Sequence, residues 1–120
     1  CGAFLGAVAS HRPVVIDGFI SVVAALCAAR LCPAARDYFV PSHLSYEIGY
    51  RLALEELRLE PIFQLSMRLG EGSGCPLAFQ VLSAACSIIN DMATFDQAGI
   101  DDGYLEEIRE GDKFTVEARK

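Results

Sequence analysis

Positive charge is scarce in this sequence. Its 120 residues include 10 Lys and Arg against 16 Asp and Glu, which gives a formal net charge of -6 and a pI near 4.8. Proteins bind nucleic acid largely through Lys and Arg side chains that displace counterions from the phosphates. We therefore expect no nucleic-acid partner.

Long apolar runs are also missing. The longest one, residues 19–31, is shorter than the ~20 residues that cross a bilayer, and it contains Arg30. A secretory signal would need a charged start, an apolar stretch and a small-residue cleavage site, and the first residues show no such order. We expect a cytoplasmic protein with no membrane partner. The chain starts at Cys1 inside a Gly- and Ala-rich apolar pattern, which favours the interpretation that its start is a cut.

Cysteine and histidine are few and scattered. The five cysteines are odd in number and most lie among Ala, Leu and Val, where a thiol packs as a small hydrophobic group. We predict free thiols in a reducing compartment, with Cys27 and Cys86 buried in helices. His11 and His43 are far in sequence from the cysteine pair Cys27 and Cys32, so we expect no metal site and no cofactor.

Strand and helix patterns alternate along the chain. The first apolar run, at 13–17, has no polar alternation, as expected of a strand covered on both faces of a parallel sheet. The predicted elements are a strand at 13–17, a helix at 19–32, a strand at 37–40, a helix at 46–59, an ambiguous segment at 62–69, a glycine loop at 70–74 and a helix at 76–92. This order predicts an α/β fold that is part of a doubly wound, Rossmann-like parallel sheet with flanking helices. The tail at 101–120 is charged, and its pattern allows one or two helical turns at 104–109.

Ligands of parallel sheets bind beyond the carboxyl ends of the strands. We therefore expect Asp17-Gly18, residues 42–45 and residues 69–74 to meet at one edge. The Gly18 N–H suits a phosphate at the start of the next helix; the alternative, a plain turn at Asp17-Gly18, is less favoured because sites in this fold are built at strand ends. Ser42 or Ser45 could cap the helix at 46–59, and His43 is more typical of a structural than of a catalytic residue.

The glycine loop, Leu-Gly-Glu-Gly-Ser-Gly at 69–74, is the most informative segment. Its alternating glycines allow close approach to a ligand, and Glu71 in the middle could accept a proton if it were partly desolvated at the mouth of a pocket. The alternative is a turn with a solvated glutamate. No Lys-Ser or Lys-Thr follows the glycines, so a phosphate-binding loop is excluded. Glu71 lies two residues before Ser73, where a nucleophile elbow would need glycine.

Four blocks in order resemble the nicotinate-nucleotide:dimethylbenzimidazole phosphoribosyltransferase family over about residues 1–100. They are Pro-Val-Val-Ile-Asp-Gly-Phe-Ile-Ser at 13–21, Arg-Asp-Tyr at 36–38 with Ser42-His43, Arg-Leu-Gly-Glu-Gly-Ser-Gly at 68–74, and Asp-Met-Ala-Thr-Phe at 91–95. The resemblance is to the C-terminal part of the family's α/β domain, so that the N-terminal portion of the fold would be missing. That portion carries a second important glutamate and a phosphate-binding lysine in the family.

The resemblance implies a reaction. A ring nitrogen of dimethylbenzimidazole attacks the anomeric carbon of nicotinate mononucleotide, nicotinate leaves, and α-ribazole phosphate forms for the lower ligand of cobalamin. Glu71 matches the family's catalytic general base, and Leu69 matches a residue of the base pocket. The resemblance also implies a homodimer whose substrates are these two small molecules, with little activity in this stretch of chain alone.

Other substrate-binding positions follow less directly. Gly18 and Ser45 match positions near the ribose phosphate, and Asp17 is their neighbour. Gly70 and Gly72 leave space for a flat aromatic ligand. Cys75 and Cys86 depart from the family pattern, because small apolar residues are expected there.

Two further functions are compatible with the sequence. One is a non-catalytic ligand-binding or assembly module that keeps the glycine loop as a cradle. The other is a related transferase that uses a different aromatic base, since benzimidazoles, purines and phenols would differ mainly in contacts outside this stretch.

Overall fold

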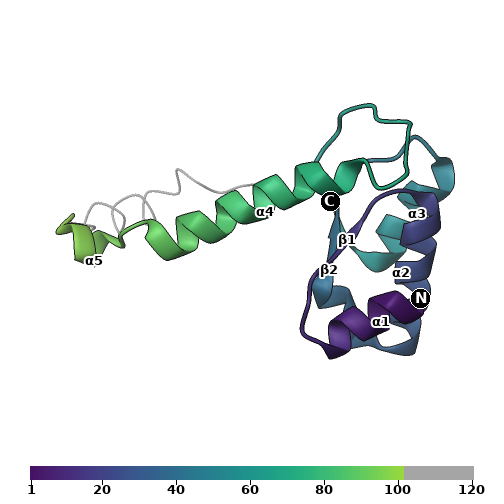
Figure 1. Ribbon diagram of the computed structural model, residues 1–120, viewed down its shortest axis with the longest axis horizontal. Helices are drawn as coiled ribbons and strands as arrows, with labels where there is room; N and C mark the ends of the chain where they lie inside the picture. The colour runs from purple at the N-terminus through teal and green to yellow at the C-terminus, as the bar shows by residue number, and fades with distance from the viewer. Residues whose placement is uncertain (102–120) are drawn as a thin grey trace, which may run out of the picture. The chain divides into compact units, whose positions relative to one another are not determined.

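A parallel β-α-β unit forms the first half of the chain (Figure 1). Strand β1 (Val14–Ile16) pairs in parallel with β2 (Phe39–Pro41). Helix α2 (Phe19–Leu31) and the 3-10 helix η1 (Pro33–Tyr38) connect the two strands. This order confirms the α/β fold that was predicted from the alternating patterns.

The computed structural model describes residues 1–101. The chain divides into two compact units, Cys1–Ala84 and Ala85–Lys120. The sheet, the buried core and the glycine loop all belong to the first unit. The predicted helical turns at 104–109 lie outside the described residues.

The segment that was ambiguous between strand and loop is extended only at its start. The Ile62 N–H donates to the Pro41 carbonyl at 3.1 Å, and His43 and Phe63 form an isolated parallel bridge. The rest of 62–69 contains no helix or strand. A minimal third strand position therefore lies beside β2 at Ile62 and Phe63, and an irregular segment leads from there to the glycine loop.

The predicted strand at 37–40 is wrong at its start. Residues 33–38 form η1, and β2 begins only at Phe39. Pro33 has a fixed φ that suits the first turn of a helix, and the Ala35 N–H closes that turn on the Cys32 carbonyl at 2.9 Å. Ala35 is fully buried, so packing also favours the helical turn.

Helix α3 (Ile48–Leu57) is shorter than the predicted 46–59. It ends at Leu57, and the next residue, Arg58, is the C-cap and adopts the left-handed conformation with φ 55°. Neither serine proposed as a cap acts as one, because Glu47 is the N-cap residue and makes no side-chain cap. The Ser42 hydroxyl binds the Ile16 carbonyl instead, and the Ser45 hydroxyl binds the Glu47 carboxylate.

Helix α4 (Gly74–Asp91) starts two residues before the predicted position and keeps Pro76 in its first turn. The sequence interpretation missed two helices, α1 (Gly2–Ala9) and α5 (Phe95–Ala98). The second carried a readable signal, a capping box in which Thr94 and Gln97 bond each other's backbone N–H.

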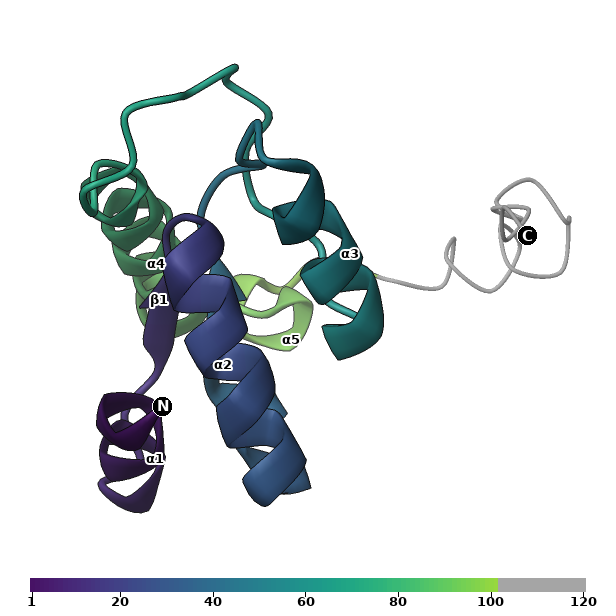
Figure 2. The ribbon, with the colours of Figure 1, turned by 90° about the vertical axis from the view of Figure 1, so that its right-hand side faces the viewer.

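The core lies where α2 packs against α3 and the sheet (Figure 2). Its buried residues are Ile16, Val22, Ala25, Ala28, Ala35, Phe39, Tyr50, Ala53, Leu54 and Leu57. Helix α2 is apolar nearly all round but buries only one face. Among the described residues nothing covers the opposite face, where Ile20 is 88% exposed.

The prediction that Cys27 and Cys86 are buried is wrong. Both lie in helices, as expected, but both are exposed. Cys27 lies outside the face that α2 buries. Cys86 lies beyond Ala78, the last residue that α4 buries, so the broad apolar face predicted for 77–89 is largely exposed within the described residues.

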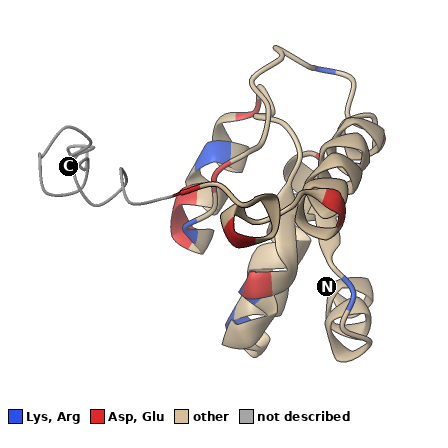
Figure 3. Ribbon diagram, turned by 90° about the vertical axis from the view of Figure 1, so that its left-hand side faces the viewer, with Lys and Arg blue, Asp and Glu red and all other residues tan. Residues whose placement is uncertain are grey.

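Charged residues of both signs occur on α3, whereas α1 carries none (Figure 3). One exposed ion pair joins Arg30 of α2 to Glu56 of α3 at 2.6 Å, and pairs of this kind contribute little to stability. Within residues 1–101 we find no helix with the length and apolar character needed to cross a bilayer.

Candidate active site

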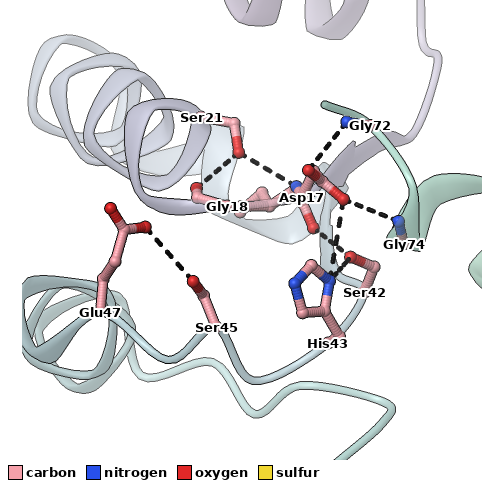
Figure 4. Close-up of polar contacts among 10 residues, drawn as sticks. Asp17, Gly18, Ser21, Ser42, His43, Ser45, Glu47, Gly72 and Gly74 are labelled. Atoms are coloured by element: carbon pink, nitrogen blue, oxygen red, sulfur yellow. Dashed lines mark hydrogen bonds and ion pairs between the residues drawn. The ribbon is translucent and has the colours of Figure 1, made fainter. Parts of the chain in front are cut away.

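Three segments that are distant in sequence meet beyond the carboxyl ends of the strands (Figure 4). Asp17 follows β1 and accepts hydrogen bonds from the glycine loop. His43 follows β2, and its Nδ1 lies 3.7 Å from Asp17 Oδ1. This confirms the prediction that 17–18, 42–45 and 69–74 share one edge of the sheet.

The glycine loop holds Glu71 in an unusual conformation. Gly70, Glu71 and Gly72 have φ values of 69°, 54° and 80°, and the Ser73 N–H donates to the Gly70 carbonyl at 2.9 Å. Positive φ at both central residues is typical of a type I′ turn. Glycine adopts this region freely, but at Glu71 it costs about 1 kcal/mol. The fold therefore maintains a strained backbone at the predicted catalytic residue.

Both oxygens of the Asp17 carboxylate bind this loop. Oδ2 accepts from the Gly72 N–H at 2.9 Å, and Oδ1 accepts from the Gly74 N–H at 2.8 Å. Gly74 is the first residue of α4, and a negative charge at the start of a helix is stabilised by the helix dipole. Asp17 is buried, which strengthens these charge-assisted bonds.

The Asp17 backbone is fixed as well. The Ser21 hydroxyl accepts from the Asp17 N–H at 3.0 Å and donates to the Gly18 carbonyl at 2.7 Å. Because Ser21 lies in the first turn of α2, these bonds fix the end of β1 relative to the start of α2.

Below the loop, Ser42 and His43 are almost completely buried. The Ser42 hydroxyl donates its one hydrogen to the Ile16 carbonyl at 2.8 Å. The 3.1 Å contact between Ser42 Oγ and His43 Nδ1 therefore requires Nδ1 to carry the hydrogen. This supports a structural role for His43, whose N–H faces the Asp17 carboxylate.

Tyr50, which is buried, and Cys75, which is partly buried, complete the polar cluster, and neither has the properties of a base or a nucleophile. The Tyr50 ring stacks on His43 with centroids 6.5 Å apart. Burial raises the pKa of Tyr50, and the negative charges of Asp17 and Cys75 raise it further. Burial and then Asp17 also raise the pKa of the Cys75 thiol, so the thiolate that a nucleophile requires is disfavoured.

All seven residues predicted for the site line one cavity of about 840 Å³. They are Asp17, Gly18, Ser45, Leu69, Gly70, Glu71 and Gly72. Its volume suits a small organic ligand. Glu71 is exposed in the cavity, so the partial desolvation expected of it is not present in the described structure.

Several lining residues were not recognised as site residues from the sequence. Phe19, Ile20 and Met67 add apolar surface, and Arg68 adds a positive charge. The Arg68 guanidinium lies 4.2 Å from the centroid of the Tyr46 ring, a cation–π geometry. The position of Arg68 in the 68–74 block was a signal that could have identified it.

The fold and the site define an α/β protein with a cavity of ligand size at the carboxyl edge of a parallel sheet. A family model described as Phosphoribosyltransferase matches residues 1–100. The chain belongs to this phosphoribosyltransferase family, as the four blocks predicted.

Named relatives specify the family further. The nicotinate-nucleotide–dimethylbenzimidazole phosphoribosyltransferase of Clostridium perfringens is 54% identical over 115 residues, which are 96% of this chain and 32% of that protein. The enzyme of the same name from Desulforamulus reducens is 51% identical over 102 residues, which are 85% of this chain and 29% of that protein. The chain thus spans about a third of the length of the curated relatives it matches.

Solved structures agree. A crystal structure of nicotinate-nucleotide-dimethylbenzimidazole phosphoribosyltransferase from Thermus thermophilus superposes with a TM-score of 0.79 at 42% identity. The match covers 85% of this chain and 31% of that structure. This confirms the Rossmann-like fold class.

Proposed function

We propose that this chain forms part of the active site of a nicotinate-nucleotide–dimethylbenzimidazole phosphoribosyltransferase. The observation that carries the proposal is the position of Glu71, in a strained turn between two glycines and in the same cavity as Gly18 and Ser45. The names of the relatives supply the substrates. The enzyme would act in the cytoplasm as a homodimer, with residues 1–100 belonging to its α/β domain.

The proposed chemistry needs one base. A ring nitrogen of dimethylbenzimidazole forms a bond to the anomeric carbon of nicotinate mononucleotide, and the bond from that carbon to the nicotinate nitrogen breaks. The second ring nitrogen of dimethylbenzimidazole loses its proton to the Glu71 carboxylate. Nicotinate leaves with the electrons of the broken bond. The ligand itself would desolvate Glu71 as it fills the cavity, which would raise the basicity of the carboxylate.

The cavity walls suit these two substrates. Leu69, Phe19 and Met67 provide apolar surface for a flat ring. Gly18 precedes the first turn of α2, where backbone N–H groups can bind a phosphate, and Ser45 adds a hydroxyl. One cavity therefore offers both an apolar surface for the base and polar groups for the nucleotide.

The test is steady-state kinetics of the full-length protein carrying Glu71→Gln. The amide keeps the shape of the side chain but cannot take the proton, so kcat should fall by ~10² to 10⁴ while the KM for nicotinate mononucleotide stays nearly constant. Glu71→Asp should recover little activity, because the shorter side chain loses reach to the ring nitrogen.

Glu55→Gln is the matched control. Glu55 is an exposed residue of α3 that does not line the cavity, so this variant should keep wild-type kinetics. Wild-type turnover in Glu71→Gln would remove the general-base assignment. A loss of affinity alone would make Glu71 a binding residue and favour the ligand-binding module instead.

A further inference from the structure

The peptide units on both sides of Glu71 are held by hydrogen bonds, and one of these bonds comes from the end of β1, far away in the sequence. The Gly70 carbonyl, in the peptide before Glu71, accepts from the Ser73 N–H at 2.9 Å. The Gly72 N–H, in the peptide after Glu71, donates to Asp17 Oδ2 at 2.9 Å. Turn and carboxylate together therefore fix the direction in which the Glu71 side chain leaves the backbone.

A second hydrogen bond to Asp17 fixes the start of α4 as well. Its Oδ1 accepts from the Gly74 N–H at 2.8 Å, so one carboxylate spans the end of the turn and the start of α4. Asp17 is 8% exposed, and water therefore competes little for these bonds. A carboxylate offers one acceptor oxygen to each of the two N–H groups, whereas a side-chain amide would place its NH₂ group toward one of them.

The hydrogen bonds from Asp17 oppose the backbone strain at Glu71. Gly70, Glu71 and Gly72 all have positive φ, and glycines on both sides give the segment many other conformations. Without an external acceptor, a glutamate in this conformation would relax toward the ordinary region of φ and carry its carboxylate away from the cavity. Asp17 supplies that acceptor from a residue 55 positions earlier in the chain.

We propose that Asp17 is the positioning residue that sets Glu71 for catalysis, acting through the Gly72 and Gly74 amides and not as a ligand of the substrate. This inference rests on the proposed function, because it assumes that Glu71 is the base. Asp17 also precedes Gly18 directly, and its own N–H is held by Ser21. It thereby fixes the base relative to the part of the cavity that would hold the phosphate.

The test is a double-mutant cycle on the full-length protein. Asp17→Asn keeps the size of the side chain but turns an NH₂ group toward one of the two amides. We expect kcat to fall about 10- to 100-fold, as misplacement of a catalytic group by about 1 Å can do, with the KM for nicotinate mononucleotide changed less than about threefold. In a Glu71→Gln background the same substitution should lower kcat less than about threefold further, because a residue that acts through Glu71 has nothing left to position.

Two results would overturn the inference. If the double variant lost kcat by the product of the two single losses, Asp17 would act independently of Glu71. A raised KM with unchanged kcat would make Asp17 a substrate ligand.

Asp96→Asn, at an exposed position in the first turn of α5, is the control and should leave both constants unchanged. If Asp17→Asn does not fold, Ser21→Ala replaces it, because loss of the hydroxyl that holds the Asp17 backbone should lower kcat in the same direction.

Amide hydrogen exchange separates this inference from the proposed function. The Gly72 and Gly74 amides should exchange slowly in the wild-type protein and at least about tenfold faster in Asp17→Asn, whether or not the protein is a transferase. Equal exchange rates of these two amides in both proteins would refute the claim that Asp17 fixes the loop. An inactive wild-type protein with the expected exchange would refute the proposed function and, with it, the catalytic role of Asp17.

Discussion

Gly74→Ala should be strongly destabilising, because the added methyl group has no room. A Cβ at this position would lie 2.3 Å from His43 Nδ1, 2.5 Å from Ser42 Oγ and 2.9 Å from Asp17 Oδ1. All three distances are shorter than real Cβ contacts, and the neighbours are buried side chains that hydrogen bonds hold in place. Either the cluster or the start of α4 must move.

The size of the effect follows from two losses. Overpacking a well-packed site costs about 1–3 kcal/mol, and losing the bond between the Gly74 N–H and the Asp17 carboxylate costs about 1.5–3 kcal/mol. The free energy of unfolding should therefore fall by about 2.5–6 kcal/mol. Urea unfolding of the purified protein, followed by circular dichroism, measures this change.

Gly6→Ala provides the matched control. Gly6 lies inside α1, and a Cβ there would meet nothing within 4 Å. Because alanine favours a helix over glycine, this variant should be stabilised by up to about 1 kcal/mol. If Gly74→Ala were within about 0.5 kcal/mol of the wild type, the close packing of His43, Ser42 and Asp17 around the loop would be refuted.

Three further predictions concern Tyr50 and Cys75. Tyr50 Oη is buried without a hydrogen-bond partner among the described residues. Tyr50→Phe should therefore raise the free energy of unfolding by about 1 kcal/mol. A loss of stability in urea unfolding would show instead that the hydroxyl has a partner. Since the folded-state pKa of Tyr50 is raised, the wild type should also lose stability as the pH rises above the unfolded value of ~10, and Tyr50→Phe should reduce this loss. Cys75 has a raised pKa and should be alkylated by iodoacetamide at pH 8 more slowly than the exposed Cys86; mass spectrometry would show the order, and equal rates would contradict it.

The location of the candidate site could be predicted from the sequence because it depends on local signals. An apolar run at 13–17 and a glycine loop at 70–74 mark a strand end and a turn, and the rule for parallel sheets brings them to one edge. The choice of Glu71 came from its place between glycines and from the family resemblance. The structure adds that these glycines, with φ values of 69° and 80°, form a left-handed turn around it.

The partners of each side chain could not be predicted in the same way. Ser42 was one of two serines considered as a helix cap, but it binds the Ile16 carbonyl because the strands place it beside β1. Asp17 was expected beside the phosphate, and its bonds to amides 55 and 57 residues away follow only from the tertiary arrangement. Burial of Cys27 was overpredicted because composition shows that a helix is apolar but not which of its faces is covered.

In the proposed reaction, Glu71 takes the proton of dimethylbenzimidazole. The most direct measurement is a crystal structure of the full-length protein with dimethylbenzimidazole bound. If Glu71 is the base, one of its carboxylate oxygens should lie about 2.6–3.2 Å from a ring nitrogen, with the Gly72 and Gly74 amides still bonded to Asp17. A bound base whose nitrogens have other partners, with the Glu71 carboxylate directed into solvent, would contradict it.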